Sequence, residues 1–128
     1  MRLLLDTHLL LWAGLQPDRL SPAMSELLED ESNLPMFSAA SVWEISIKAG
    51  LGRADFTVDS RSFRRALIDN GYEELSITSA HAAAIADLPA IHRDPFDRML
   101  VAQARVEGIT LFTSDRTVSA YGSPARLV

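Results

Sequence analysis

Short apolar runs alternate along this chain with longer segments of helical periodicity. The first run, residues 3–5, is wholly apolar and ends at Asp6-Thr7, a pattern typical of a strand buried on both faces of a parallel sheet. Similar runs recur further along, and most of them are followed by polar residues. The pattern predicts strands at residues 3–5, 34–38, 75–78 and 109–113, with a short fifth at 125–128.

The intervening segments carry signals for helix starts and stops. Ser21-Pro22 and Asp94-Pro95 each place a capping side chain before a proline at the first helical position. Ser41 and Glu44 have the spacing of a capping box, and Gly14 is expected to close the first helix. Helices are therefore predicted at about residues 7–13, 22–28, 42–50, 60–70, 79–88 and 95–107.

The alternation of strands and helices predicts an α/β fold, because right-handed crossovers place helices on both faces of a parallel sheet. We expect a three-layer α/β/α sandwich with a central parallel sheet of four to five strands. The length of 128 residues suits one domain, 1–128, with one core. In such folds ligands bind beyond the carboxyl ends of the strands, so the residues that follow each strand are the candidates for function.

Composition narrows the chemistry further. The chain has no cysteine, which excludes disulfides, thiolate nucleophiles and thiolate zinc sites and suits a reducing compartment. Its formal net charge of −5 argues against non-specific coating of nucleic acid through the overall field. The apolar runs are too short for a membrane span or a signal peptide, so we expect a cytoplasmic protein that does not bind membranes.

Four acids fall where the carboxyl edge of the sheet is expected. Asp6 and Asp115 directly follow strands, while Glu44 and Asp97 lie near the starts of helices. Each has a local explanation: a helix cap for Asp6, a capping box for Glu44, the helix dipole for Asp97 and an Asx-turn for Asp115. These local roles do not explain why all four lie at one edge.

A cluster of carboxylates needs a counter-ion. Two carboxylates about 4 Å apart repel by roughly 4 kcal/mol at an effective dielectric near 20, so clustering requires a cation or raised pKa values. Oxygen ligands without cysteine favour hard ions, Mg²⁺ or Mn²⁺, over zinc. The three histidines, His8, His81 and His92, lack metal-binding spacing and are expected to be structural or solvent-facing, although His8 and His92 lie near this edge in the predicted fold.

At these residues the chain resembles the PIN-domain ribonucleases, and among them the VapC-type toxins of toxin–antitoxin systems. The resemblance implies a PIN-like fold and a metal-dependent endoribonuclease that hydrolyses RNA to 5′-phosphate and 3′-hydroxyl ends. It also implies a VapB-type antitoxin, held in an apolar groove near the site, and a homodimer. The matching segments are residues 4–7, 38–45, 93–104 and 113–115.

The family pattern assigns roles to particular positions. It makes Asp6, Glu44, Asp97 and Asp115 the catalytic, metal-binding acids, with the hydroxyls of Thr7 and Ser114 beside them. Asp94 competes with Asp97 for the third place, and the spacing to the alanines of the same helix favours Asp97. His8 departs from the pattern, in which asparagine often follows the Asp-Thr pair.

An acidic site that admits RNA needs cations at its border. Lys48, Arg93, Arg98 and Arg116 are the sequence neighbours of the four acids and are the candidates for phosphate contact. Salt bridges or solubility explain them about equally well.

Two other classes of function remain to be compared. A binding module of the same fold would keep the pocket without cleaving RNA, and an aspartyl-phosphate phosphatase or receiver also places an aspartate after its first strand. The phosphatase pattern expects a second aspartate two residues after Asp6, where this chain has His8. A receiver expects a lysine after its late strands, whereas Lys48 lies far earlier.

Overall fold

The computed structural model describes all 128 residues of the chain. Five strands and seven α-helices, with two short 3₁₀ turns, follow one another in the order expected of alternating strand and helix segments. The strands are β1 (Arg2–Leu5), β2 (Leu34–Ser38), β3 (Glu73–Leu75), β4 (Thr110–Thr113) and β5 (Ala125–Leu127). The helices are α1 (Thr7–Leu15), α2 (Pro22–Glu29), α3 (Ala39–Gly50), α4 (Ser60–Asp69), α5 (Ser79–Ala84), α6 (Pro95–Glu107) and α7 (Arg116–Ser119), and the 3₁₀ turns are η1 (Pro17–Arg19) and η2 (Ile85–Asp87).

All five strands are parallel and lie in the order β3-β2-β1-β4-β5, which confirms the predicted parallel sheet. The chain winds from the central β1 outward to β3 and then crosses back to β4 on the other side of β1. The strand order therefore reverses beside β1, and this switch point is where α/β folds bind ligands. Both neighbours of β1 deliver their carboxyl ends to the same edge.

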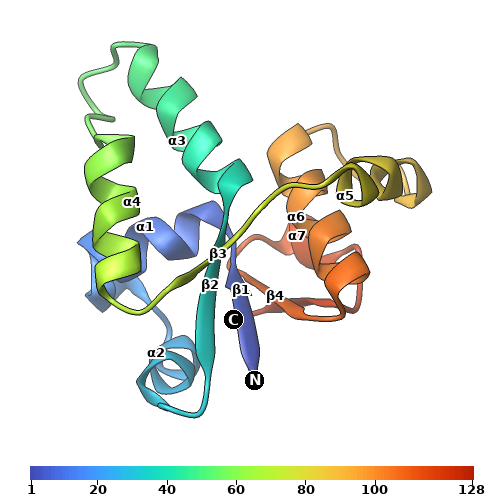
Figure 1. The fold of residues 1–128 in the computed structure, drawn as a ribbon, viewed down its shortest axis with the longest axis horizontal. Coiled ribbons are helices and arrows are strands. Elements are labelled where there is room, and N and C mark those ends of the chain that lie inside the picture. The colour runs from blue at the N-terminus through green and yellow to red at the C-terminus, as the bar shows by residue number, and fades with distance from the viewer.

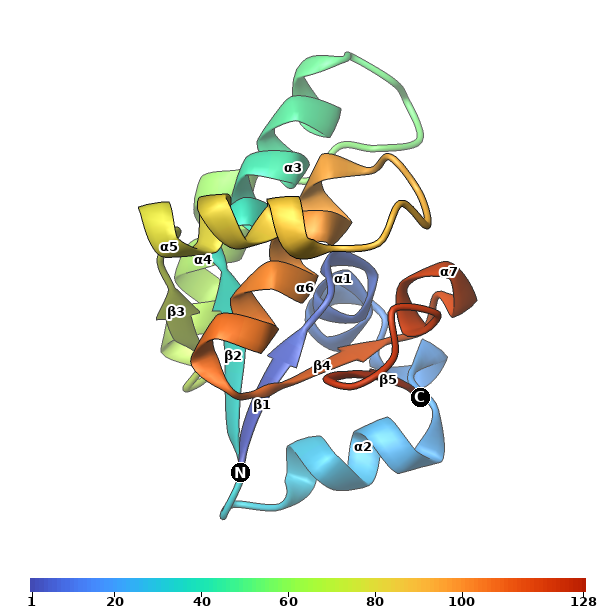
Figure 2. The same ribbon diagram turned by 90° about the vertical axis from the view of Figure 1, so that its right-hand side faces the viewer.

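Two layers of helices cover the sheet (Figure 1). Helices α1, α2 and α4 lie on one face, and Figure 2 looks onto the other face, which carries α5, α6 and α7. The sheet divides the expected single core into two clusters, one on each face. The side chains of β1 alternate between them, because Leu3 and Leu5 pack with α1 and α4 whereas Leu4 packs with α6. The three-layer prediction is thus confirmed. None of the helices has the length and apolar character needed to cross a lipid bilayer.

The sequence did not predict α7, and the predicted helix at residues 79–88 is α-helical only to Ala84 and continues as the 3₁₀ turn η2. Three further local details also differ from the sequence prediction. The third strand spans Glu73–Leu75 rather than residues 75–78, because β3 pairs with β2 in the register that sets Leu75 opposite Ser38. Helix α1 continues through Gly14 to Leu15, and a side chain at Gly14 would meet the Phe63 ring at 3.3 Å. The glycine permits close helix packing and does not end the helix.

The third difference concerns the start of α3. The predicted capping box of Ser41 and Glu44 is wrong, since the helix begins immediately after β2 and its cap is Ser38, whose hydroxyl accepts a hydrogen bond from the Ala40 amide at 3.0 Å. Ser41 and Glu44 consequently lie inside the helix and are free to make tertiary contacts. The predicted caps at Ser21 and Asp94 are confirmed.

Candidate active site

A threonine hydroxyl joins two of the four acids at the carboxyl ends of β1 and β4. The Thr113 hydroxyl donates a hydrogen bond to Oδ2 of Asp6 and accepts one from the Asp115 amide at 2.9 Å. Asp6 also caps α1, because its Oδ1 accepts the Leu9 amide hydrogen at 2.9 Å. Asp115 caps α7 through the Thr117 amide at 2.8 Å, as the predicted Asx-turn requires. Asp6 and Asp115 therefore cap their helices and also lie together at this edge of the sheet.

The third acid, Glu44, comes from the middle of α3, which a neighbouring contact fastens to α1. The Thr7 hydroxyl donates to the Ser41 hydroxyl at 2.9 Å, which fastens α1 to α3 one turn before Glu44. Glu44 is only 7% exposed, and its Oε2 pairs with Lys48 at 3.0 Å. Its other oxygen, Oε1, is buried without a hydrogen-bond partner. Such an orphaned acceptor is rare and is a sign of a missing ligand.

The fourth acid, Asp97, lies in the first turn of α6, where Asp94 caps the helix through the amides of Phe96 and Asp97. Oδ2 of Asp97 lies 3.3 Å from Nε2 of His92. Burial raises the pKa of Asp97 from 3.8 to about 6, and the charge of Asp94 adds to this shift. The hydrogen bond with His92 opposes it, while the charges of Glu44 and Asp6 add smaller contributions. The charges of Glu44 and Asp6 therefore act on Asp97 across the site.

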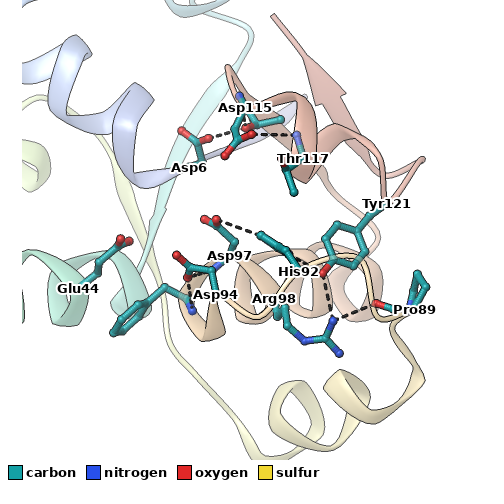
Figure 3. A network of polar contacts seen from close by, with 12 residues as sticks. Asp6, Glu44, Pro89, His92, Asp94, Asp97, Arg98, Asp115, Thr117 and Tyr121 are labelled. Atoms are coloured by element: carbon teal, nitrogen blue, oxygen red, sulfur yellow. Dashed lines mark hydrogen bonds and ion pairs between the residues drawn. The ribbon is translucent and has the colours of Figure 1, made fainter.

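Asp6 is under similar electrostatic stress. Burial raises its pKa, while the hydrogen bonds from Thr113 and Leu9 and the nearby His8 oppose this shift, and the charge of Asp115 adds to it. Figure 3 shows the carboxylates of Asp6, Asp97 and Asp115 facing one another, with Glu44 opposite them on α3. The four predicted acids thus lie at one edge of the sheet, where the charge of Asp115 acts on Asp6 and the charges of Glu44 and Asp6 act on Asp97.

The donor set fits a hard divalent cation. It consists of carboxylate oxygens, one of them orphaned, and their mutual repulsion is what a bound cation would offset. No three His, Asp or Glu side chains lie close enough to form a closed metal-binding cluster. Mg²⁺ usually keeps several waters and takes only one or two carboxylates directly, so separated acids remain compatible with it.

The remaining predicted site residues differ in whether their side chains are paired within the protein or exposed to solvent. Thr7 does not contact an acid directly but fastens α1 to α3, and Ser114 lies half-buried between Thr113 and Asp115. Lys48 is paired with Glu44, while Arg98 donates to the Pro89 and Ile85 carbonyls and to the Tyr121 hydroxyl. Arg93 and Arg116 are exposed beside the site.

Sequence reasoning missed two residues that touch the acids, Thr113 and His92. Thr113 belongs to a recognised motif segment, and the signal that points to it is a hydroxyl on the last residue of a strand. His92 was expected to be structural or solvent-facing, yet it bridges Asp97 to the Tyr121 hydroxyl at 2.8 Å. Its partner Tyr121 is 29 residues away, so no local pattern could have indicated this contact.

The fold and the order of its elements lead to the comparison with known families, in which residues 3–123 match the PIN domain. The chain belongs to the PIN-domain family. At the level of individual proteins it is 31% identical to Ribonuclease VapC22 of Mycobacterium tuberculosis, over 94% of this chain and 92% of that protein. The identity and coverage are high enough to place both in one family.

Solved structures with the same fold come from toxin–antitoxin complexes. VapBC2 from Rickettsia felis, bound to a DNA fragment from its promoter, matches with a TM-score of 0.70 and 14% identity, covering 100% of this chain and 98% of that one. A toxin–antitoxin complex from Klebsiella pneumoniae matches at 0.65 and 17% identity, covering 96% and 94%. VapBC-1 from nontypeable Haemophilus influenzae matches at 0.64 and 16% identity, covering 100% and 97%. At these identities the matches establish the shared fold.

The raised pKa of Asp97 predicts a pH dependence of stability in the metal-free protein. An acid whose pKa is higher in the folded than in the unfolded state makes the folded state bind more protons between the two values. The free energy of unfolding should therefore fall as pH rises from about 4 to about 6, and stay lower above this range. The Asp97→Asn variant lacks this loss.

The expected difference is about 1–2 kcal/mol at pH 7, reduced from the full shift because the side chain is 20% exposed. Urea unfolding of both proteins in EDTA, at several pH values between 4 and 7, measures it. The comparison therefore measures the titration of Asp97 together with its electrostatic coupling to Asp6, Glu44 and Asp94. Parallel pH profiles for the two proteins would show that Asp97 is not destabilised by its surroundings.

Proposed function

We propose that the chain is a Mg²⁺- or Mn²⁺-dependent endoribonuclease and the toxin of a toxin–antitoxin pair. The observation that carries this proposal is the convergence of Asp6, Glu44, Asp97 and Asp115 at the switch point of a PIN-family sheet, with a buried Glu44 oxygen left without a partner. Its relative VapC22 is named a ribonuclease, which supports the same chemistry. Thr7 and Ser114 are proposed to support the acids.

The acids divide the work of hydrolysis. A divalent cation, when bound, would lower the pKa of a coordinated water and offset negative charge on the phosphate. Asp6, Asp97 and Asp115 are the residues that would hold it, directly or through water, and Thr113 keeps two of them in fixed orientation. The free Oε1 of Glu44 can accept a hydrogen bond from the attacking water and orient it toward phosphorus. No side-chain nucleophile is needed, and the products carry 5′-phosphate and 3′-hydroxyl ends.

The RNA backbone needs cations near these acids. Arg93 and Arg116 are exposed beside Asp94 and Asp115 and are the better placed of the four predicted cations. Lys48 already neutralises Glu44, and the three hydrogen bonds of Arg98 are to groups of the chain itself. We propose that Arg93 and Arg116 contact phosphates. Lys48 stays paired with Glu44 until RNA enters, and Arg98 has a mainly structural role.

The geometry speaks against an aspartyl-phosphate enzyme. In such an enzyme an oxygen of the aspartate after β1 must be free to attack phosphorus. Here Oδ1 of Asp6 accepts the Leu9 amide hydrogen and Oδ2 accepts the Thr113 hydroxyl hydrogen, and the residue is 3% exposed. Both oxygens of Asp6 are thus held in a fixed orientation, which suits a ligand better than a nucleophile.

One experiment tests both chemistry and target. Purified protein is incubated with total RNA with and without Mg²⁺, and the cleaved ends are sequenced. We expect cuts at defined sites only with the metal, leaving 5′-phosphate ends. A protein that binds RNA but leaves it intact under both conditions would support the binding-module alternative.

The antitoxin is proposed to occupy an apolar groove. A cavity of about 780 Å³ lies among α1, α2 and α4, and it is lined by Leu15, Leu28 and Phe63 among other residues. The structural neighbours are toxin–antitoxin complexes, which supports a protein partner here. We propose that a VapB-type antitoxin inserts apolar side chains into this groove.

A charge at the groove rim should weaken this binding. Leu15 is 57% exposed, so Leu15→Arg should leave the fold intact while placing a charge in the groove. We expect at least tenfold weaker binding of the antitoxin encoded beside this gene, measured by calorimetry. The matched control is Val106→Arg, at an equally apolar position on α6 that is 44% exposed and outside the groove. Equal affinities for both variants would place the antitoxin elsewhere.

A homodimer is also part of the proposal. Trp43, Ile47 and Leu51 are exposed along one side of α3, at helical spacing, and offer an apolar surface for a second copy. Light scattering at micromolar concentration measures the mass directly. A monomer at all concentrations would remove the dimer and leave the nuclease proposal unchanged.

A further inference from the structure

A hydrogen-bonded chain beside the acids begins and ends on α6. Arg98 donates from Nη1 to the Tyr121 hydroxyl at 3.1 Å, and this hydroxyl lies 2.8 Å from Nδ1 of His92. Nε2 of His92 in turn lies 3.3 Å from Oδ2 of Asp97, the residue that precedes Arg98. Three segments, α6, the loop before it and the turn after α7, are joined in this way (Figure 3).

The direction of each hydrogen bond follows from the chemistry of the groups. An arginine can only donate, so the Tyr121 oxygen accepts from Arg98 and its own hydrogen is left for the nearest acceptor. That acceptor is Nδ1 of His92. A neutral imidazole that accepts at Nδ1 carries its hydrogen on Nε2, and Nε2–H therefore points at the Asp97 carboxylate. Only this arrangement gives every hydrogen-bond donor and acceptor in the series from Arg98 to Asp97 a partner.

The side chains that make this series of hydrogen bonds are held firmly by their surroundings. Tyr121 is 6% exposed and belongs to the core cluster under α6, and its ring lies 5.4 Å from the His92 ring. Arg98 is fixed by two backbone carbonyls besides Tyr121. The imidazole consequently has little freedom to turn. One oxygen of Asp97 is restrained by Nε2–H, which leaves the other oxygen to the space between the acids.

We propose that His92 and Tyr121 are positioning residues that hold the Asp97 carboxylate ready for a divalent cation, an inference that rests on the proposed function. Hydrogen-bond partners of metal-binding side chains fix their orientation, and losing such a partner costs typically 10–100-fold in metal affinity. His92 acts on Asp97 directly, and Tyr121 acts through His92. Arg98 is part of the same hydrogen-bond network, since it fixes the direction of the Tyr121 hydroxyl.

A merely structural role is the competing explanation, and the tautomer distinguishes the two. In ¹⁵N-histidine-labelled protein, two-bond ¹H–¹⁵N correlation spectra at mildly alkaline pH report which ring nitrogen carries the hydrogen. We expect His92 to carry it on Nε2 in the unmodified chain and to show a mixture of tautomers in Tyr121→Phe. A His92 that carries its hydrogen on Nδ1 in the unmodified chain would overturn the proposal.

Manganese affinity supplies the second readout. Calorimetric titration with Mn²⁺ should show about 10–100-fold weaker binding for His92→Ala. His92→Gln should recover most of this loss, because its side-chain amide can place an N–H near the position of Nε2. Tyr121→Phe, which keeps the ring, should weaken binding by several-fold, whereas the control Tyr72→Phe, on the opposite face of the sheet, should not.

The outcomes separate this inference from the proposed function. If the unmodified chain binds Mn²⁺ and cleaves RNA but His92→Ala binds Mn²⁺ equally well, the positioning role is wrong and the nuclease proposal stands. If the unmodified chain binds no Mn²⁺, the proposed function fails and this inference fails with it. Should His92→Ala be too unstable to purify, His92→Gln and Tyr121→Phe still decide the question.

Discussion

Replacing Asp97 by asparagine is expected to reduce RNA cleavage on the order of 10³-fold while the protein stays folded. The substitution removes one of the negative charges that face the site but keeps the size of the side chain and an oxygen that can accept from His92. Since burial and neighbouring acids already destabilise the charged Asp97, the variant should melt a few degrees higher than the unmodified chain at pH 7. Single-turnover cleavage and thermal unfolding measure the two effects.

The matched control lies in the same helical turn. Asp94 caps α6 through two backbone amides, and asparagine caps helices about as well as aspartate. Asp94→Asn should therefore keep its stability and most of its cleavage activity. A variant series in which Asp94→Asn is inactive and Asp97→Asn is active would exchange the roles of the two residues. Full activity of both variants would contradict the acidic site as a whole.

Removing divalent cations is the second large expected effect. EDTA should abolish cleavage, and Mg²⁺ or Mn²⁺ in excess should restore it, because without a counter-ion the acids repel the RNA phosphate as well as one another. Binding should also stabilise the fold, by about 2.7 kcal/mol at a metal concentration 100 times the dissociation constant. Thermal unfolding with and without Mn²⁺ records this change.

Asp97→Asn serves as the control for the metal effect. It should show a smaller stabilisation by Mn²⁺ than the unmodified chain, because one of the carboxylates is lost. Cleavage that continues in EDTA at an unchanged rate would argue for a mechanism without a metal. In that case the raised pKa of Asp97 would be the feature to explain instead.

Much of the fold could be predicted because its signals are local. The apolar run of β1, the Asp94-Pro95 cap and the alternation of strands with helices each depend on residues close in sequence. The position of β3 depends on distant pairing, since Met36 of β2 sets the register of Glu73 at the exposed end of the sheet. The start of α3 was misjudged because two serines, Ser38 and Ser41, compete for the cap, and β2 decides in favour of the first.

The candidate site was predictable to the same extent. Asp6 and Asp115 follow strands and Asp97 lies in the first turn of α6, so their common edge could be deduced from the order of elements. Glu44 lies inside α3, and its place at this edge depends on α3 starting directly after β2. The supporting contacts of the acids could not be deduced, because Thr113 bonds Asp6 across 107 positions and His92 depends on Tyr121. The partners of the basic side chains could not be predicted either, since only the structure shows Lys48 paired with Glu44 and Arg98 bound to carbonyls.

The pairing of β1 with β4 has a consequence during protein synthesis. Asp6 leaves the ribosome early, but its partner Thr113 and the acid Asp115 are translated more than a hundred residues later. A nascent chain therefore has no assembled acidic edge for most of its elongation. Under the proposed function, RNA hydrolysis would begin only once β4 has docked, and the ribosome that makes this protein would not be exposed to that activity until translation is nearly over.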